Sequence, residues 1–299
     1  MKDAILGFNK QFAFIPKIEN KSKLKKTKKC ILLGMGGSHL AADVLQSYNS
    51  SFPLVIHSDY GLPNLSVASL KESLIIASSY SGNTEEVIEG FEIARKKKFP
   101  LAVIAVGGKL LELAKKHQVP YIELPNTGIQ PRSALGFSFM ALLAMMNEKK
   151  GYQEAQKLTK QLQPKKIEIL GKNLAEKLRG TVPVIYTSSQ NKAVAYNWKI
   201  KLNETGKIPA FYNIIPELNH NEMVGWTLPQ SSFFVLILRD LSTHPQNLKR
   251  MEITAELLRK QGVEVEILDM AGGSVYSKVF TSIALGDFTS YHLALKYGQ

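Results

Sequence analysis

Short, almost wholly apolar segments that alternate with helical patterns are the feature that most limits how this chain can fold. In the first half, such segments predict strands at 29–33, 53–58, 73–79, 100–107 and 120–124. Helical spacing of apolar residues occupies 84–98 and 110–117, in the intervals between strands. Strands that lack a polar face are covered on both sides. The alternation therefore predicts a doubly wound α/β fold, with a parallel sheet flanked by helices.

The same series restarts in the second half, after a Lys- and Gln-rich helical connection over 151–180. Strands are predicted at 181–188, 233–240 and 263–270, and helices at 192–202 and 245–261. This weak internal repeat predicts two α/β subdomains, residues 1–150 and residues 151–299. A long apolar helix over 133–148 would close the first subdomain or pack between the two.

Length and cysteine content bound the class of protein. A chain of 299 residues with 44% hydrophobic content can bury a substantial core. Its single cysteine, Cys30, lies in the apolar run CILLG, so we expect a buried, reduced thiol, which favours the cytoplasm. The N-terminal segment has neither a signal-peptide pattern nor the roughly 20 apolar residues that cross a bilayer. We therefore expect a cytoplasmic protein that neither is secreted nor spans a membrane.

Positive charge is the strongest bias in the composition. The formal net charge is +13, and its densest cluster is KSKLKKTKK at 21–29. Such a surface attracts polyanions, but no recognition helix, zinc spacing or aromatic-basic RNA signature accompanies it. A solvated linker is the plainer interpretation of this segment. We expect no nucleic-acid partner, and the same potential would help to capture a small phosphorylated substrate.

The first candidate binding loop is Gly-Met-Gly-Gly-Ser at 34–38, where a predicted strand ends and a helix begins. Free backbone N–H groups and the helix dipole favour an anion there, and Gly37 and Ser38 are the candidate contacts. The loop is not a dinucleotide fingerprint, because His39 stands where the last glycine would fall. No G-x-x-x-x-G-K-[ST] motif occurs either, which disfavours a nucleoside triphosphate.

A second loop, Ser-Ser-Tyr-Ser-Gly-Asn-Thr-Glu-Glu at 78–86, follows another predicted strand and leads into a helix. The hydroxyls of Ser79, Ser81 and Thr84 can converge with backbone amides on phosphate oxygens, and Gly82 allows a close turn. One such loop alone would be explained by helix capping. Two loops at the carboxyl ends of neighbouring parallel strands favour a ligand site. The second half lacks such paired loops, so we expect the halves to divide the work.

The two loops are similar to those of the sugar-isomerase (SIS) superfamily, whose domains bind phosphosugars. The segment Gly-Ile-Gln-Pro-Arg-Ser-Ala at 128–134, followed by an apolar helix, resembles a narrower family, the bifunctional phosphoglucose/phosphomannose isomerases. The resemblance spans almost the whole chain. It implies two SIS-type subdomains and an enzyme that interconverts glucose 6-phosphate and mannose 6-phosphate with fructose 6-phosphate through an enediolate. No cofactor is implied.

Two further segments match those that carry the catalytic Glu and His of this family: Asn-Glu-Thr-Gly-Lys at 203–207 and Glu-Leu-Asn-His-Asn-Glu at 217–222. The resemblance implies that Glu204, at a predicted helix end, is the base that moves a proton between C1 and C2. It implies that His220, in a polar loop predicted over 216–222, assists ring opening. Taken singly, a solvated or capping carboxylate and a structural loop histidine are the alternatives.

The C-terminal segment 286–298 resembles the closing helix of the family. Its match at Lys296 implies acid/base work at the ring oxygen, with a surface lysine as the alternative. Thr289, seven residues earlier, would leave room for either C2 epimer, as a threonine does in the family. Arg132 matches an arginine that stabilises the enediolate, and a surface salt bridge is its alternative.

Other functions fit the residues less well. A noncatalytic phosphosugar sensor would need the phosphate loops but not Glu204, His220, Arg132 and Lys296 together. Half of an aminosugar synthase would need a glutaminase domain with an N-terminal cysteine, and position 2 is Lys2. The histidine spacing matches no metal motif, so we expect no metal. The resemblance also implies a homodimer with shared active sites, in which the partner chain supplies the histidine.

Overall fold

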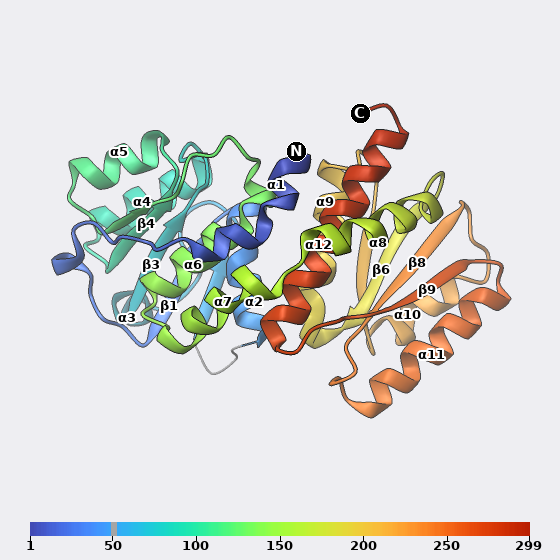
Figure 1. Ribbon diagram of the computed structural model, residues 1–299. Helices are drawn as coiled ribbons and strands as arrows, with labels where there is room; N and C mark the ends of the chain where they lie inside the picture. Colours follow the sequence, from blue (N-terminus) through green and yellow to red (C-terminus); the bar gives the residue numbers. More distant parts are fainter. Residues whose placement is uncertain (49–52) are drawn as a thin grey trace. The chain divides into compact units, whose positions relative to one another are not determined.

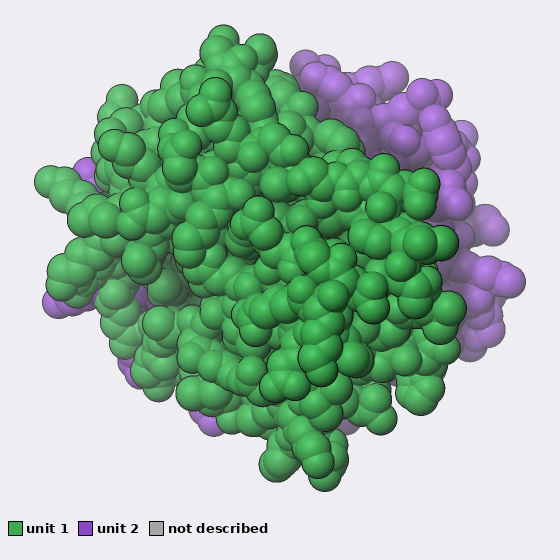
Figure 2. All heavy atoms as spheres, turned by 90° about the vertical axis from the view of Figure 1, so that its right-hand side faces the viewer, with its two compact units in different colours: residues 1–7, 161–299 green, residues 8–160 purple. Residues whose placement is uncertain are grey.

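The computed structural model describes residues 1–48 and 53–299 and divides into two compact units, coloured separately in Figure 2. One unit consists of residues 8–160, and the other joins residues 1–7 to residues 161–299. We call them the N-terminal unit and the C-terminal unit. The domain boundary expected after residue 150 lies inside helix α7, Lys149–Gln161.

The N-terminal unit contains a sheet of five parallel strands in the order β2-β1-β3-β4-β5 (Figure 1). The strands are β1 Lys29–Leu33, β2 Leu54–His57, β3 Ser73–Ser78, β4 Leu101–Ala105 and β5 Tyr121–Glu123. They coincide with the apolar segments that predicted them. The strand order reverses between β1 and β3, so the loops after these strands lie at the topological switch point where such sheets bind ligands.

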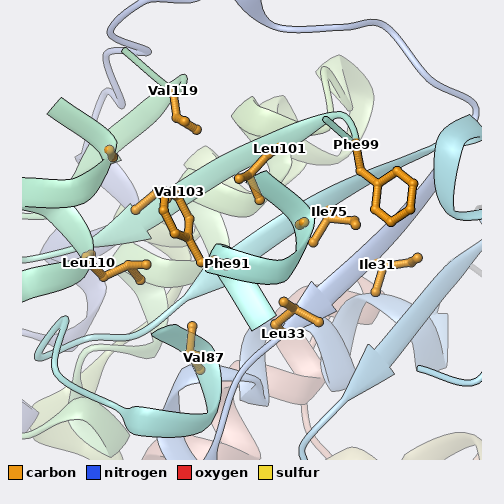
Figure 3. Close-up of a cluster of buried hydrophobic side chains, with 14 of the residues drawn as sticks. Ile31, Leu33, Ile75, Val87, Phe91, Phe99, Leu101, Val103, Leu110 and Val119 are labelled. Carbon is orange, nitrogen blue, oxygen red and sulfur yellow. The ribbon is translucent and has the colours of Figure 1, made fainter. Parts of the chain in front are cut away.

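Helices cover both faces of this sheet. They are α2 Leu40–Tyr48, α3 Val67–Glu72, α4 Glu85–Lys96, α5 Gly108–Lys116, α6 Leu135–Met145 and α7. On one face, Phe91 of α4 and Leu110 of α5 join Ile31 and Val103 of the strands in one buried cluster (Figure 3). Alternate strand residues such as Leu32 point to the other face and are buried there too. Full burial of a side chain such as Phe91 contributes about 1.5–3 kcal/mol.

The C-terminal unit contains four parallel strands in the order β7-β6-β8-β9. They are β6 Val182–Ser188, β7 Phe211–Ile215, β8 Phe233–Arg239 and β9 Glu264–Asp269. The helices are α1 Lys2–Leu6, α8 Pro164–Lys177, α9 Lys192–Glu204, α10 Leu218–Gly225, α11 Pro245–Lys260 and α12 Val275–Lys296. The strand order reverses between β6 and β8, so this unit repeats the winding of the other. The predicted α/β class, with parallel sheets flanked by helices, is confirmed.

One predicted connection differs from the structure. The segment 216–222 was expected to be a loop, and this is wrong, because most of it lies in α10. Leu218 and Trp226 are buried in the core of the unit and give this short helix an inner face. The connection over 151–180 is helical, as predicted, and consists of two helices, since Pro164 starts α8 and has no N–H to continue a helix.

Candidate active site

The two predicted phosphate loops meet in the N-terminal unit, at the ends of β1 and β3. The first loop contains a 3-10 turn, Gly36–Ser38, that leads into α2. The Ser38 hydroxyl accepts a hydrogen bond from the backbone N–H of Tyr80 at 3.0 Å. The Ser38 carbonyl accepts one from the Ser78 hydroxyl at 2.9 Å. These bonds join the two loops into one structure.

The second loop is organised around Ser79. The hydroxyls of Ser79 and Thr84 lie 2.8 Å apart, and the Ser79 oxygen also accepts from the backbone N–H of Gly82 at 3.0 Å. Thr84 is the N-cap of α4 but makes no side-chain capping bond, so helix capping alone does not explain its hydroxyl. Ser79 is fully buried, whereas Ser81 is exposed and Thr84 half-buried. Ser81 and Thr84 are therefore the accessible hydroxyls of the loop.

Two glycines allow these loops to approach their neighbours. Gly82 has φ +74°, and a Cβ atom there would lie 1.8 Å from the carbonyl oxygen of Gly107. A Cβ atom on Gly37 would lie 3.0 Å from the backbone nitrogen of Arg132. Any larger residue at Gly82 would displace backbone, and Gly37 places the first loop directly against the turn that carries Arg132.

Arg132 lies in a 3-10 turn, Pro131–Ser133, directly before α6. The residue is only 8% exposed, so it is not the surface arginine of the alternative interpretation. The backbone of Arg132 lies against the first loop, and a guanidinium can stabilise negative charge on a substrate. The N-terminal unit thus brings together the predicted residues Gly37, Ser38 and Arg132 with the loop over 79–84.

Sequence reasoning missed two residues that support this arrangement. The buried side chain of Gln11 donates to the carbonyl of Ser133 at 2.7 Å and accepts from the N–H of Gly136 at 2.9 Å, so it holds the end of the Arg132 turn and the start of α6. No sequence signal links positions 122 residues apart. His39, next to Ser38, contacts the Asp43 carboxylate through Nδ1 at 2.6 Å. Their spacing of four residues at a helix start was the available signal.

In the C-terminal unit, α9 ends at Glu204, as the sequence predicted. The Glu204 residue is exposed, and the helix behind it is firmly anchored. Trp198 is fully buried, and its Nε1 donates to the Ser282 hydroxyl of α12 at 3.2 Å. Three residues before Glu204, Lys201 forms a buried ion pair with Asp287 of α12. The carboxylate therefore sits at the end of a rigid element.

His220 is exposed on α10. Beneath this helix, Glu222 accepts hydrogen bonds from the Tyr186 hydroxyl and the Asn213 amide, and Trp226 donates to the Tyr186 oxygen at 2.9 Å. Burial, reinforced by the Glu222 carboxylate, raises the pKa of Tyr186, so the phenol stays protonated and remains the donor. The network holds the helix while leaving the imidazole open to solvent.

Helix α12 carries the last two predicted residues. Thr289 is fully buried, and its hydroxyl donates to the carbonyl of Leu285 at 2.8 Å. Lys296 ends the helix and pairs with Glu176 of α8. The hydrogen bond from Lys296 lowers the pKa of the Glu176 carboxyl. For Lys296 to transfer a proton at the ring oxygen of a sugar, its ammonium would have to leave the Glu176 carboxylate and contact the sugar instead.

Among residues 1–48 and 53–299, no group of three or more His, Cys, Asp or Glu side chains is arranged to hold a metal ion. In the same described ranges, no helix has both the length and the apolar character needed to cross a membrane.

Comparison with known proteins identifies the class first. Residues 167–299 match the model of the bacterial phospho-glucose isomerase C-terminal SIS domain. The fold is similar to that of glucosamine-6-phosphate deaminase from Thermotoga maritima, with a TM-score of 0.72 and 16% identity over 99% of this chain and 93% of that chain. That likeness concerns the fold alone. With its paired loops at the switch point, the protein is of the SIS-domain class.

Two relatives are more similar in sequence. The bifunctional phosphoglucose/phosphomannose isomerase of Caldicellulosiruptor bescii is 35% identical over 296 residues, which cover 92% of this chain and 86% of that protein. The protein of the same name from Aquifex aeolicus is 32% identical over 299 residues, which cover 98% of this chain and 91% of that protein. The chain belongs to the bifunctional phosphoglucose/phosphomannose isomerase family.

Proposed function

We propose that this protein is an aldose-ketose isomerase that interconverts glucose 6-phosphate and mannose 6-phosphate with fructose 6-phosphate. The observation that carries the proposal is the joined pair of loops at the β1/β3 switch point, with the buried Arg132 beside them. Backbone N–H groups, hydroxyls and a guanidinium gathered there suit a phosphorylated sugar. Membership of the isomerase family supports the reaction type.

The proposed reaction is a proton transfer between neighbouring carbons. The phosphate group binds at Ser38 and the loop over 79–84, and His220 and Lys296 move protons during ring opening. Glu204 removes the C2 proton of the open-chain aldose, which places negative charge on the C1 oxygen of an enediolate. Arg132 stabilises that charge. The C2 hydroxyl gives its proton to the C1 oxygen, Glu204 returns the carbon-bound proton to C1, and the C2 carbonyl of the ketose forms without a redox cofactor.

Tolerance of both C2 epimers is assigned to Thr289. A longer side chain at this fully buried position would have to occupy space now taken by neighbouring atoms. Thr289→Gln is therefore expected to reduce formation of mannose 6-phosphate relative to glucose 6-phosphate. An unchanged product ratio in a folded variant would remove Thr289 from the proposal.

The proposal also includes a cytoplasmic homodimer in which His220 of one protomer serves the site of its partner. The exposed position of His220 is compatible with this arrangement. Mixing inactive His220→Ala chains with inactive Glu204→Gln chains tests it. Recovered activity would support shared sites, and continued inactivity of a mixture that contains hybrid dimers would count against them.

A coupled assay tests the main proposal. Purified protein, treated with EDTA, is given fructose 6-phosphate, and the two aldose phosphates are detected separately. Wild-type protein should form both, and Glu204→Gln should form neither. Glucose 6-phosphate as the sole product would reject the dual specificity. Tight binding without turnover would favour a phosphosugar sensor and reject the isomerase.

A further inference from the structure

The helices that carry Glu204 and Thr289 are joined by an ion pair that takes no direct part in the proposed reaction. The Lys201 ammonium of α9 and an Asp287 carboxylate oxygen of α12 lie 2.6 Å apart. Their side chains are 1% and 5% exposed, so the ion pair is buried in the interior of its unit. Both belong to the C-terminal unit.

Close packing surrounds this pair. One turn before Lys201, the Trp198 indole lies against Gly286, where a Cβ atom would come within 3.0 Å of the ring. One turn after Asp287, the Ser290 hydroxyl donates to the Asp287 carbonyl at 3.0 Å. Together with the hydrogen bond from Trp198 to Ser282, these contacts define the seam between α9 and α12.

A buried ion pair contributes little net stability, because the desolvation of its two charges offsets most of their attraction. Both charges lose their hydration, and well-packed apolar residues of the same volume often give equal or greater stability. The short contact instead favours one relative position of the two helices. A slip of one residue along either helix moves the backbone by about 1.5 Å, which would separate the ammonium from the carboxylate. The pair therefore discriminates between helix registers.

Register matters at this seam because Glu204 follows Lys201 by three residues. Side chains three positions apart lie on neighbouring parts of the same helix surface. Fixing Lys201 against α12 therefore fixes the end of α9 that carries the Glu204 carboxylate. A displacement of about 1 Å in a reacting group can lower a rate by about 100-fold.

We propose that Lys201 and Asp287 are positioning residues, which set the register of α9 against α12 and thereby the place of the Glu204 carboxylate. The inference rests on the proposed function, in which Glu204 is the base. It predicts an effect on kcat with little effect on KM, since the phosphate-binding loops belong to the other unit. If the pair were purely structural, its removal would lower the stability of the protein without lowering kcat selectively over KM.

Three full-length variants test the proposal. Lys201→Met combined with Asp287→Leu removes both charges and replaces them with apolar side chains of similar shape. Asp287→Glu keeps the pair but lengthens one arm by a methylene group. Ser282→Ala is the matched control, because it removes a neutral hydrogen bond from the same seam. We expect the first two to lower kcat for fructose 6-phosphate by about 10- to 100-fold. Their KM should stay within about twofold, whereas Ser282→Ala should lower Tm and leave kcat unchanged.

A folded double variant with wild-type kcat would overturn the proposal. If the double variant does not fold, Asp287→Glu decides the question, and wild-type kcat in that variant overturns it equally. Glu204→Gln is measured in parallel, so that failure of the proposed function can be distinguished from failure of the positioning role. Full turnover by Glu204→Gln would reject the assigned base and with it the proposed function's mechanism. An inactive Glu204→Gln beside a fully active double variant would reject the positioning role alone.

Discussion

At the scale of single residues, buried polar side chains hold the elements of the candidate site in place. Gln11, Lys201 and Asp240 are each at most 4% exposed, and each has hydrogen-bond or ionic partners far away in sequence. The desolvation penalty of a buried polar group without a partner exceeds the net stability that its hydrogen bond contributes. Removing one partner therefore destabilises the protein by more than the free energy of the bond alone.

Gln11 offers a first test at this scale. Gln11→Leu leaves the Ser133 carbonyl and the Gly136 N–H without this partner, and we expect it to lower the free energy of unfolding by about 2 kcal/mol. Because Arg132 directly precedes Ser133 in the same turn, kcat should fall as well. Urea unfolding and steady-state kinetics measure the two effects. Asn9→Leu is the control, since Asn9 bonds the Thr159 carbonyl from the same segment and should affect stability only. Unchanged kcat in folded Gln11→Leu would contradict the prediction.

Asp240 offers a pH test. Burial alone would raise its pKa, but hydrogen bonds from Lys278 and Ser242 outweigh burial and bring the pKa below the ordinary 3.8. Since the folded pKa is the lower one, the carboxylate contributes stability that is complete above about pH 4 and is lost as pH falls through the folded pKa. Asp240→Asn should therefore cost about 2 kcal/mol at neutral pH and much less in strong acid.

Urea unfolding of wild type and Asp240→Asn at a series of pH values measures this difference. Asp269→Asn is the control, because Asp269 pairs with Arg239 in a mostly exposed position and should matter much less. The free energy of unfolding should differ less between wild type and Asp240→Asn in acid than at neutral pH. A difference that stays constant over this range would contradict the assigned charge pairing.

At the scale of elements, the loops at the ends of the short parallel strands are held by close backbone contacts. Gly82→Ala places a methyl group 1.8 Å from the Gly107 carbonyl oxygen, so the second phosphate loop must move. We expect Kd for a hexose 6-phosphate to rise about tenfold or more, equivalent to at least about 1.4 kcal/mol. Isothermal titration on the Glu204→Gln background avoids turnover.

Gly262→Ala is the matched control for this loop. Gly262 has nearly the same φ, +78°, but a Cβ atom there meets nothing within 4 Å. Both substitutions therefore strain the backbone alike, and only Gly82→Ala also collides with a neighbour. Equal affinities for Gly82→Ala and Gly262→Ala would show that the close approach at Gly82 is not needed for binding.

At the scale of the whole molecule, two units with the same winding have different switch points. In the C-terminal unit, the space after β6 and β8 is filled by the chain's own polar groups. Asp240 accepts from Lys278 at 2.8 Å and from the Ser242 hydroxyl, also at 2.8 Å. Ser188 and Thr243 lie 3.2 Å apart and are buried. Asp240 directly follows β8, at the position that Ser79 of the second loop takes after β3 in the other unit.

This difference predicts one phosphosugar site per chain. Titration of Glu204→Gln with glucose 6-phosphate should therefore give a stoichiometry of one. Ser81→Ala, in the N-terminal unit, should weaken that single binding event, whereas Ser242→Ala should not. Two binding events per chain would show that the C-terminal switch point is open as well.

Much of this architecture could be predicted from sequence. The strands of the N-terminal unit were identified correctly, and the two loops that the sequence predicted to bind phosphate do meet at the ends of β1 and β3, since apolar runs, glycines and hydroxyl residues express local preferences. The loop predicted around His220 was wrong, because a segment rich in polar residues conceals the inward-facing Leu218 and Trp226 that make it a helix. Polar composition alone does not distinguish an exposed loop from a short helix with one buried side.

The sequence by itself determined the α/β class and the family to which the chain belongs, and it located the two loops proposed to bind phosphate. These depend on residues that are close together along the chain. Only the tertiary structure decided that Gln11 holds the Arg132 turn, that Lys201 meets Asp287, and that Asp240 fills the second switch point. Each of these contacts joins residues that lie far apart in the chain, and they meet only because packing of the apolar cores brings their elements together.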